Sequence, residues 1–234
     1  MSDSTGLKTQ SVKIWSDQSI NQKSDAIAEE VPIALVYNDV SHAVMMGTPT
    51  DLKAFAIGFS LSEGIIGKKD DIYDIKCAFG LDGVEVGLTI SNQRFAELKE
   101  RRRSLTGRTG CGICGSESLK QVRLKAKPVT NHFDVSHEAV NQAVEQLGTK
   151  QPLQNSTGAV HGAAWCNSHG NILEICEDVG RHNALDKLIG VLAQKDLLQD
   201  DYLSNGFMLV SSRASYEMVQ KTAMVNDLSL IHIS

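Results

Sequence analysis

Apolar and polar positions divide the chain into a polar leader and two structured parts. Residues 1–30 have no apolar periodicity, and we expect them to form a flexible leader. Two β-hairpins are predicted next. One pairs Val31–Tyr37 with His42–Met46, and the other pairs Ile72–Phe79 with Val84–Ile90. The first structured part therefore begins with antiparallel strands.

A helix is predicted between the two hairpins. Thr48 is a candidate N-cap, Pro49 suits the first helical position, and Asp51 stands three residues after the cap, as in a capping box. A second helix is expected over Phe95–Arg103. We therefore predict a hairpin-and-helix α+β subdomain over residues 31–128.

Strands and helices alternate in the second structured part. In chain order, the expected elements are a helix over Val135–Leu147 capped by Ser136, strands over Ala159–Cys166 and Ile172–Cys176, a helix over His182–Leu198, a strand over Phe207–Val210, and a helix that is capped by Ser212 or Ser215 and runs through Met224. This order predicts an α/β fold over residues 129–234, with helices packed on a sheet.

The composition is that of a globular protein, with 41% hydrophobic residues. The 23 Lys and Arg against 28 Asp and Glu give a net charge of −5, which argues against a nucleic-acid-binding surface. No apolar run is long enough for a membrane span, and we expect a cytoplasmic protein without a signal peptide or a membrane partner. Cytoplasmic thiols stay reduced, so each of the five Cys is structural, metal-binding or reactive.

The strongest chemical signal is Cys111 and Cys114 within the glycine-flanked run Gly110–Gly115. Basic residues precede and follow this run in a loop expected over residues 104–118, and positive charge with backbone N–H donors favours the thiolate. Three alternatives stay open: a structural zinc site that recruits further ligands, a thioredoxin-like redox pair, and buried structural cysteines. The other cysteines alternate with apolar residues in predicted strands, and we interpret them as packing residues.

Anion-binding chemistry is predicted where strands meet helices. Arg181 and His182 stand at the start of a helix within Glu177–Lys187, where free N–H groups suit a phosphate, although a helix cap with solvated charges explains the same pattern. A similar junction holds a second group of residues: Ser211, Ser212 and Arg213. His161 is flanked by small residues that would admit a ligand, or it is a buried, hydrogen-bonded histidine.

Together these motifs resemble those of the formate dehydrogenase accessory sulfurtransferase family, FdhD. The resemblance rests on four segments between Val31 and Met224: Gly110–Gly115, Ser156–Ala164, Glu177–Gly190 and Ser211–Ala223. It implies a homodimeric sulfurtransferase whose C-terminal half is similar in fold to cytidine deaminases without their zinc. After Met224 the sequence departs from the family pattern. We expect a truncated C-terminus that leaves a sheet edge exposed.

The resemblance also implies a mechanism. Cys111 would accept a persulfide sulfur from a cysteine desulfurase, with Cys114 assisting. The sulfur would pass to the molybdenum bis(molybdopterin guanine dinucleotide) cofactor of formate dehydrogenase. The anion-friendly junctions at Arg181 and Arg213 would then bind this cofactor, and a guanine nucleotide would occupy the same site. The alternatives are a thiol-disulfide oxidoreductase and a non-catalytic nucleotide- or zinc-binding chaperone of formate dehydrogenase.

Overall fold

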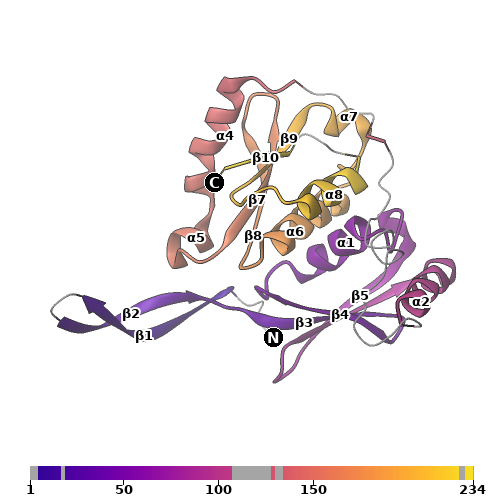
Figure 1. The fold of residues 1–234 in the computed structure, drawn as a ribbon, viewed down its shortest axis with the longest axis horizontal. Helices are drawn as coiled ribbons and strands as arrows, with labels where there is room; N and C mark the ends of the chain where they lie inside the picture. Colours follow the sequence, from indigo (N-terminus) through magenta and orange to yellow (C-terminus); the bar gives the residue numbers. More distant parts are fainter. Residues whose placement is uncertain (1–4, 17–18, 107–127, 130–133, 227–229, 234) are drawn as a thin grey trace.

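The described residues form two four-stranded sheets with helices between them, a further helix on the outer side of the C-terminal sheet, and a separate two-stranded ribbon (Figure 1). The computed structural model describes the backbone of residues 5–16, 19–106, 128–129, 134–226 and 230–233. Cys111 and Cys114, with most of the loop predicted over residues 104–118, lie outside these ranges.

The N-terminal sheet contains both predicted hairpins in the strand order β4-β3-β6-β5. Its strands are β3 (Val31–Tyr37), β4 (Val40–Gly47), β5 (Ile72–Phe79) and β6 (Val84–Ile90). Each hairpin is antiparallel, whereas β3 and β6 pair in parallel at the centre. Asn38 and Asp39 have φ angles of 45° and 64°, which suit the tight turn between β3 and β4. The predicted pairing of strands is confirmed.

The helices of the N-terminal subdomain are α1 (Leu52–Ser62) and α2 (Asn92–Thr106), with a short 3-10 helix, η1 (Lys69–Asp71). The predicted capping box of α1 is wrong. Asp51 is the N-cap residue, in a left-handed conformation without a side-chain cap bond. The Thr48 hydroxyl instead accepts a hydrogen bond from the backbone N–H of Val179 at 3.2 Å, so a long-range partner has displaced the local one.

The C-terminal sheet has the order β10-β9-β7-β8 and confirms the predicted α/β fold. Its strands are β7 (His161–Asn167), β8 (Ile172–Asp178), β9 (Gly206–Val210) and β10 (Leu230–His232). Its helices are α4 (His137–Lys150), α5 (Pro152–Thr157), α6 (Arg181–Gln194), α7 (Asp200–Leu203) and α8 (Tyr216–Met224). Ser136 caps α4 as predicted, and Ser215, rather than Ser212, caps α8. The likeness to cytidine deaminases stays a prediction.

Alternate residues of the C-terminal sheet belong to two cores. Ala164 and Cys166 of β7 pack in the smaller core with α4, whereas Ala163 and Trp165 join the main core with α6 and the N-terminal sheet. The residues after Met224 contribute β10, which pairs in parallel with β9 over three residues. The sheet edge that we expected to be exposed is therefore covered over this short length.

The expectation of a leader without regular structure is wrong. Strands β1 (Leu7–Ser16) and β2 (Ser19–Ala28) form an antiparallel ribbon that extends away from the body of the protein (Figure 1). Most side chains on both of its faces are exposed, and Trp15 is 84% exposed. Because neither face is buried along its length, the sequence carries no alternation that would predict the strands.

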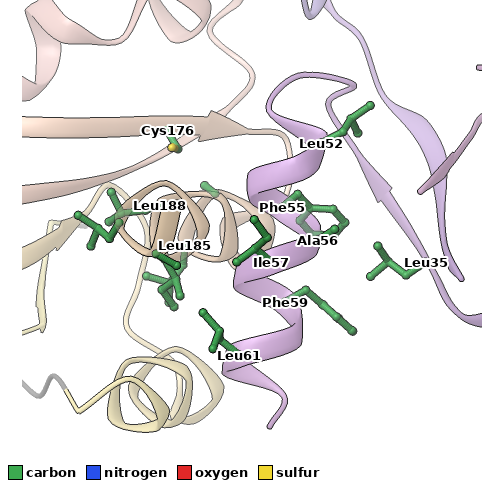
Figure 2. Packing of buried hydrophobic residues seen from close by; sticks show 14 of the residues in the cluster. Leu35, Leu52, Phe55, Ala56, Ile57, Phe59, Leu61, Cys176, Leu185 and Leu188 are labelled. Atoms are coloured by element: carbon green, nitrogen blue, oxygen red, sulfur yellow. The ribbon is translucent and has the colours of Figure 1, made fainter. Parts of the chain in front are cut away.

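Helices α1 and α6 cross at unusually short range and join the two subdomains. An added Cβ at Gly58 would lie 1.7 Å from the carbonyl oxygen of Asp186, and one at Gly190 would lie 1.8 Å from that of Ala54. Figure 2 shows the crossing, with Phe59 of α1 directed toward the N-terminal sheet. The two glycines let the helix backbones touch, so α1 contacts its own sheet and α6 at once.

Candidate functional site

The predicted ligand residues meet at one end of the C-terminal sheet. His161, at the start of β7, pairs with Asp178, at the end of β8. Beyond β9, the backbone N–H of Ser211 donates to the Gly162 carbonyl at 3.0 Å, and its hydroxyl accepts from the Gly162 N–H at 2.8 Å. The start of α6 follows β8 after a two-residue connection. His161, the Arg181 helix start and Ser211 therefore lie at the same sheet end, as the sequence predicts.

Both histidines of this site are held toward the neutral form. Burial lowers the pKa of His161, the nearby charge of Arg181 lowers it further, and Asp178 opposes the shift. Burial and Arg181 also lower the pKa of His182. His182 Nε2 lies 2.9 Å from Glu217 Oε2, an ion-pair distance without hydrogen-bond alignment. A bound anion would offset the Arg181 charge, so the site can couple anion binding to proton uptake.

The loop after β9 presents side chains of different exposure. Arg213 is exposed, whereas Ser212 is buried and its hydroxyl donates to the Arg213 carbonyl at 3.4 Å. Ser211 is half-buried and already accepts the hydrogen bond from Gly162. Ser211 and Arg213 are therefore accessible to a ligand, but the buried Ser212 serves the loop conformation.

A pocket of about 420 Å³ adjoins His161 and Ser211, and the sequence analysis identified only the small residues beside His161 as part of such a site. Its other lining residues come from α5 and the residues on either side of this helix: Gln151, Gln154, Gly158, Ala159 and Val160. The carboxylate of Glu177 accepts from the backbone N–H groups of Leu153 and Gln154, so this carboxylate fixes α5 beside the pocket. The proline in Gln151-Pro152 is a helix-start signal that could have predicted α5.

Two charged residues near the start of α6 are buried rather than solvated. Asp178 and Lys187 are each fully buried, and their side chains lie 2.7 Å apart. A solvated helix cap is therefore the wrong interpretation for these two residues. Asp178 Oδ2 also accepts from the Thr48 N–H at 3.0 Å, and its Oδ1 accepts from the Gly180 N–H at 2.8 Å. Sequence analysis missed this arrangement because Thr48 lies 130 residues before Asp178.

The described cysteines fit a packing role. Cys166 and Cys176 are buried and free, and burial raises the pKa of each thiol to about 12. Cys77 is half-buried in β5. Within the described ranges, which omit Cys111 and Cys114, no three His, Cys, Asp or Glu residues are grouped as metal ligands. The described helices are all too short or too polar to cross a bilayer.

These features define an α/β protein in which one end of the C-terminal sheet is a candidate ligand site. Residues 28–233 match the FdhD/NarQ family, and the chain belongs to this family. A structure titled as a putative formate dehydrogenase accessory protein from Desulfotalea psychrophila shares the fold. The two structures match with a TM-score of 0.72 at 22% sequence identity, and the matched region covers 97% of this chain and 84% of the other chain.

Curated relatives carry a more specific name. The protein named sulfur carrier protein FdhD in Cupriavidus necator is 50% identical over 217 residues, which are 93% of this chain and 74% of that protein. The Acinetobacter baylyi protein of the same name is 50% identical over 211 residues, which are 90% of this chain and 76% of that protein. The family predicted from the motifs is confirmed.

Proposed function

We propose that this protein is a sulfur carrier that serves formate dehydrogenase. The main support is that the chain is 50% identical, over most of its length, to a relative named as a sulfur carrier. The cysteine pair in the glycine-flanked run supplies the thiols that such a function needs. A sulfur carrier needs a nucleophilic thiol, and Cys111 stands among basic residues that favour its thiolate. Cys166 and Cys176 are poor candidates because burial disfavours their thiolates.

The sulfur donor is a cysteine desulfurase that carries a persulfide. The Cys111 thiolate attacks the outer sulfur of that persulfide and forms a new S–S bond. The original S–S bond breaks, and the desulfurase cysteine leaves as a thiolate, so the sulfur and its electrons are conserved. Cys114 assists by relaying the sulfur. The carrier then passes the outer sulfur to the molybdenum bis(molybdopterin guanine dinucleotide) cofactor, which is its substrate. The S–S bond to Cys111 breaks, Cys111 leaves as a thiolate, and the cofactor supplies the electron pair for its new bond to sulfur.

The end of the C-terminal sheet binds the guanine dinucleotide part of this substrate. Arg181 and Arg213 supply positive charge, and the first N–H groups of α6, which has no side-chain cap, supply donors for an anion. His161 and His182 can gain protons when the anion binds. Ser211 offers a hydroxyl beside the pocket, while Ser212 supports its loop. A guanine nucleotide alone binds at the same place, and the protein acts as a homodimer.

Sulfur loading tests the proposal directly. The protein is incubated with a cysteine desulfurase and cysteine, and the intact mass is measured without reductant. The parent protein should gain the mass of one sulfur atom, and Cys111→Ala should not. Cys166→Ala is the matched control and should load like the parent. Full loading of Cys111→Ala, or no loading of the parent, would overturn the proposal.

A further inference from the structure

A buried polar network joins the start of α6 to the N-terminal subdomain. We infer that Asp178, Lys187 and Thr48 are positioning residues that set the start of α6 for an anionic ligand. This inference rests on the proposed binding of a guanine nucleotide at that helix start. None of the three residues needs to touch the ligand, because each acts through the backbone between β8 and α6.

Asp178 fixes the residue that precedes α6. Its Oδ1 accepts from the backbone N–H of Gly180 at 2.8 Å and from Asn183 Nδ2 at 3.1 Å. Gly180 is the N-cap residue of α6 and has no side chain that could cap the helix. Asp178 therefore fixes the N-cap residue from two residues upstream without capping the helix, and the first N–H groups of α6 have no side-chain cap and stay available to a ligand.

Thr48 brings the N-terminal subdomain into this arrangement. Its backbone N–H donates to Asp178 Oδ2 at 3.0 Å, and its hydroxyl accepts from the Val179 N–H at 3.2 Å. Asn183 Nδ2 also donates to the carbonyl of Met46 at 2.8 Å. The connection between β4 and α1 thus holds both residues that lie between β8 and α6.

Lys187 completes the connection from inside α6. Its ammonium group pairs with Asp178 at 2.7 Å and donates to the Thr48 carbonyl at 3.0 Å and the Thr50 hydroxyl at 3.1 Å. The three N–H protons of a lysine thus have fixed acceptors in a fully buried place. A hydrophobic pair would fill this volume at a similar or lower cost in stability, but it would not orient the Gly180 N–H group.

The network predicts that the affinity of a ligand bound at the start of α6 depends on the Thr48 hydroxyl, although Thr48 does not line the pocket. Removing the Thr48 hydroxyl leaves the part-buried Val179 N–H without its acceptor and lets the turn before α6 move. An anion bound at this helix start would lose the alignment of the N–H groups with the ligand. A residue that only stabilises the fold would lower stability without this local effect.

Two conservative variants of Thr48 test the inference. Thr48→Val keeps the shape and removes the hydroxyl, and Thr48→Ser restores it. Ser60→Ala is a stability control, because buried Ser60 bonds the Tyr37 hydroxyl at 2.8 Å on the far side of α1 from this turn. Two quantities are measured on the full chain: the dissociation constant of guanosine diphosphate by calorimetry, and amide hydrogen exchange over residues 179–186.

Thr48→Val should bind guanosine diphosphate about tenfold more weakly than the parent, and the first turn of α6 should lose more protection than the global change in stability explains. The dissociation constant of Thr48→Ser should stay within about twofold of that of the parent, because serine keeps the hydroxyl. Ser60→Ala should leave both the dissociation constant and the amide exchange unchanged after correction for stability. Unchanged exchange in Thr48→Val would overturn the positioning role. A parent that does not bind the nucleotide would instead overturn the proposed ligand, because the exchange measurement needs none.

Discussion

Replacement of Gly190 by alanine should destabilise the protein through the crossing of α1 and α6. The new Cβ would lie 1.8 Å from the carbonyl oxygen of Ala54 and 2.5 Å from its carbonyl carbon. Both atoms belong to the backbone of α1, so no rotamer change can relieve the contact. The helices would have to separate by more than an ångström, and the main core between them would lose its packing.

The magnitude follows from two opposing effects. Alanine is favoured over glycine inside a helix by about 1 kcal/mol. Overpacking of a well-packed core costs about 1–3 kcal/mol where side chains can yield. Here a helix backbone must yield, so we expect the free energy of unfolding of Gly190→Ala to fall by about 3 kcal/mol or more.

Urea unfolding followed by circular dichroism measures this change, provided that the dependence on denaturant has the same slope in each variant. Gly148→Ala is the matched control, because Gly148 lies in α4 and an added Cβ there meets nothing within 4 Å. The control should gain up to about 1 kcal/mol from helix propensity alone. If Gly190→Ala is as stable as the parent or the control, the close approach of the two helices is refuted.

Two further predictions follow from shifted pKa values. Burial and Arg181 lower the pKa values of His161 and His182. The folded state therefore binds protons at these two histidines less readily than the unfolded state does. As a result, the free energy of unfolding decreases as the pH falls below about 6.5. A His161→Gln/His182→Gln variant should lose stability less steeply between about pH 6.5 and 5, and equal slopes in chemical denaturation would contradict the shifts. Burial raises the pKa values of Cys166 and Cys176, so iodoacetamide at about pH 8 should modify them only after unfolding, and peptide masses showing rapid native labelling would refute their burial.

Elements that bury one face could be predicted from the sequence, because burial leaves a periodic pattern. In β6, Val84, Val86 and Leu88 are buried and alternate with more exposed residues, and the predicted bounds of this strand are those observed. The ribbon of β1 and β2 buries neither face along its length, so its backbone pairing leaves no such signal. The prediction failed there because hydrogen bonds between backbones are independent of the side-chain pattern that the analysis used.

Local capping signals failed where a distant partner competed for the same side chain. Thr48, Pro49 and Asp51 satisfy a helix-start pattern, yet the Thr48 hydroxyl bonds the backbone of Val179. A cap stabilises a helix by about 1 kcal/mol, whereas an unpaired buried N–H costs about 1–3 kcal/mol. The part-buried Val179 N–H therefore competes with the local cap for the Thr48 hydroxyl. Only the meeting of the two subdomains creates that demand.

The candidate site could be located from the sequence, but the buried ion pairs beside it could not, and the adjacent residues Asp186 and Lys187 show why. Both look like solvated charges on an amphipathic helix, yet Lys187 pairs with Asp178 and Asp186 pairs with Lys221 of α8. Burial disfavours the charge of Lys221, but Asp186 and Glu63 outweigh it and raise its pKa. Neighbouring positions on a helix point about 100° apart, so each charge needs its own partner from another element. Asp186 is buried because α1 and α8 cover it, and Lys187 is buried because β8 and the connection between β4 and α1 cover it. This arrangement is a property of the whole fold rather than of the motif.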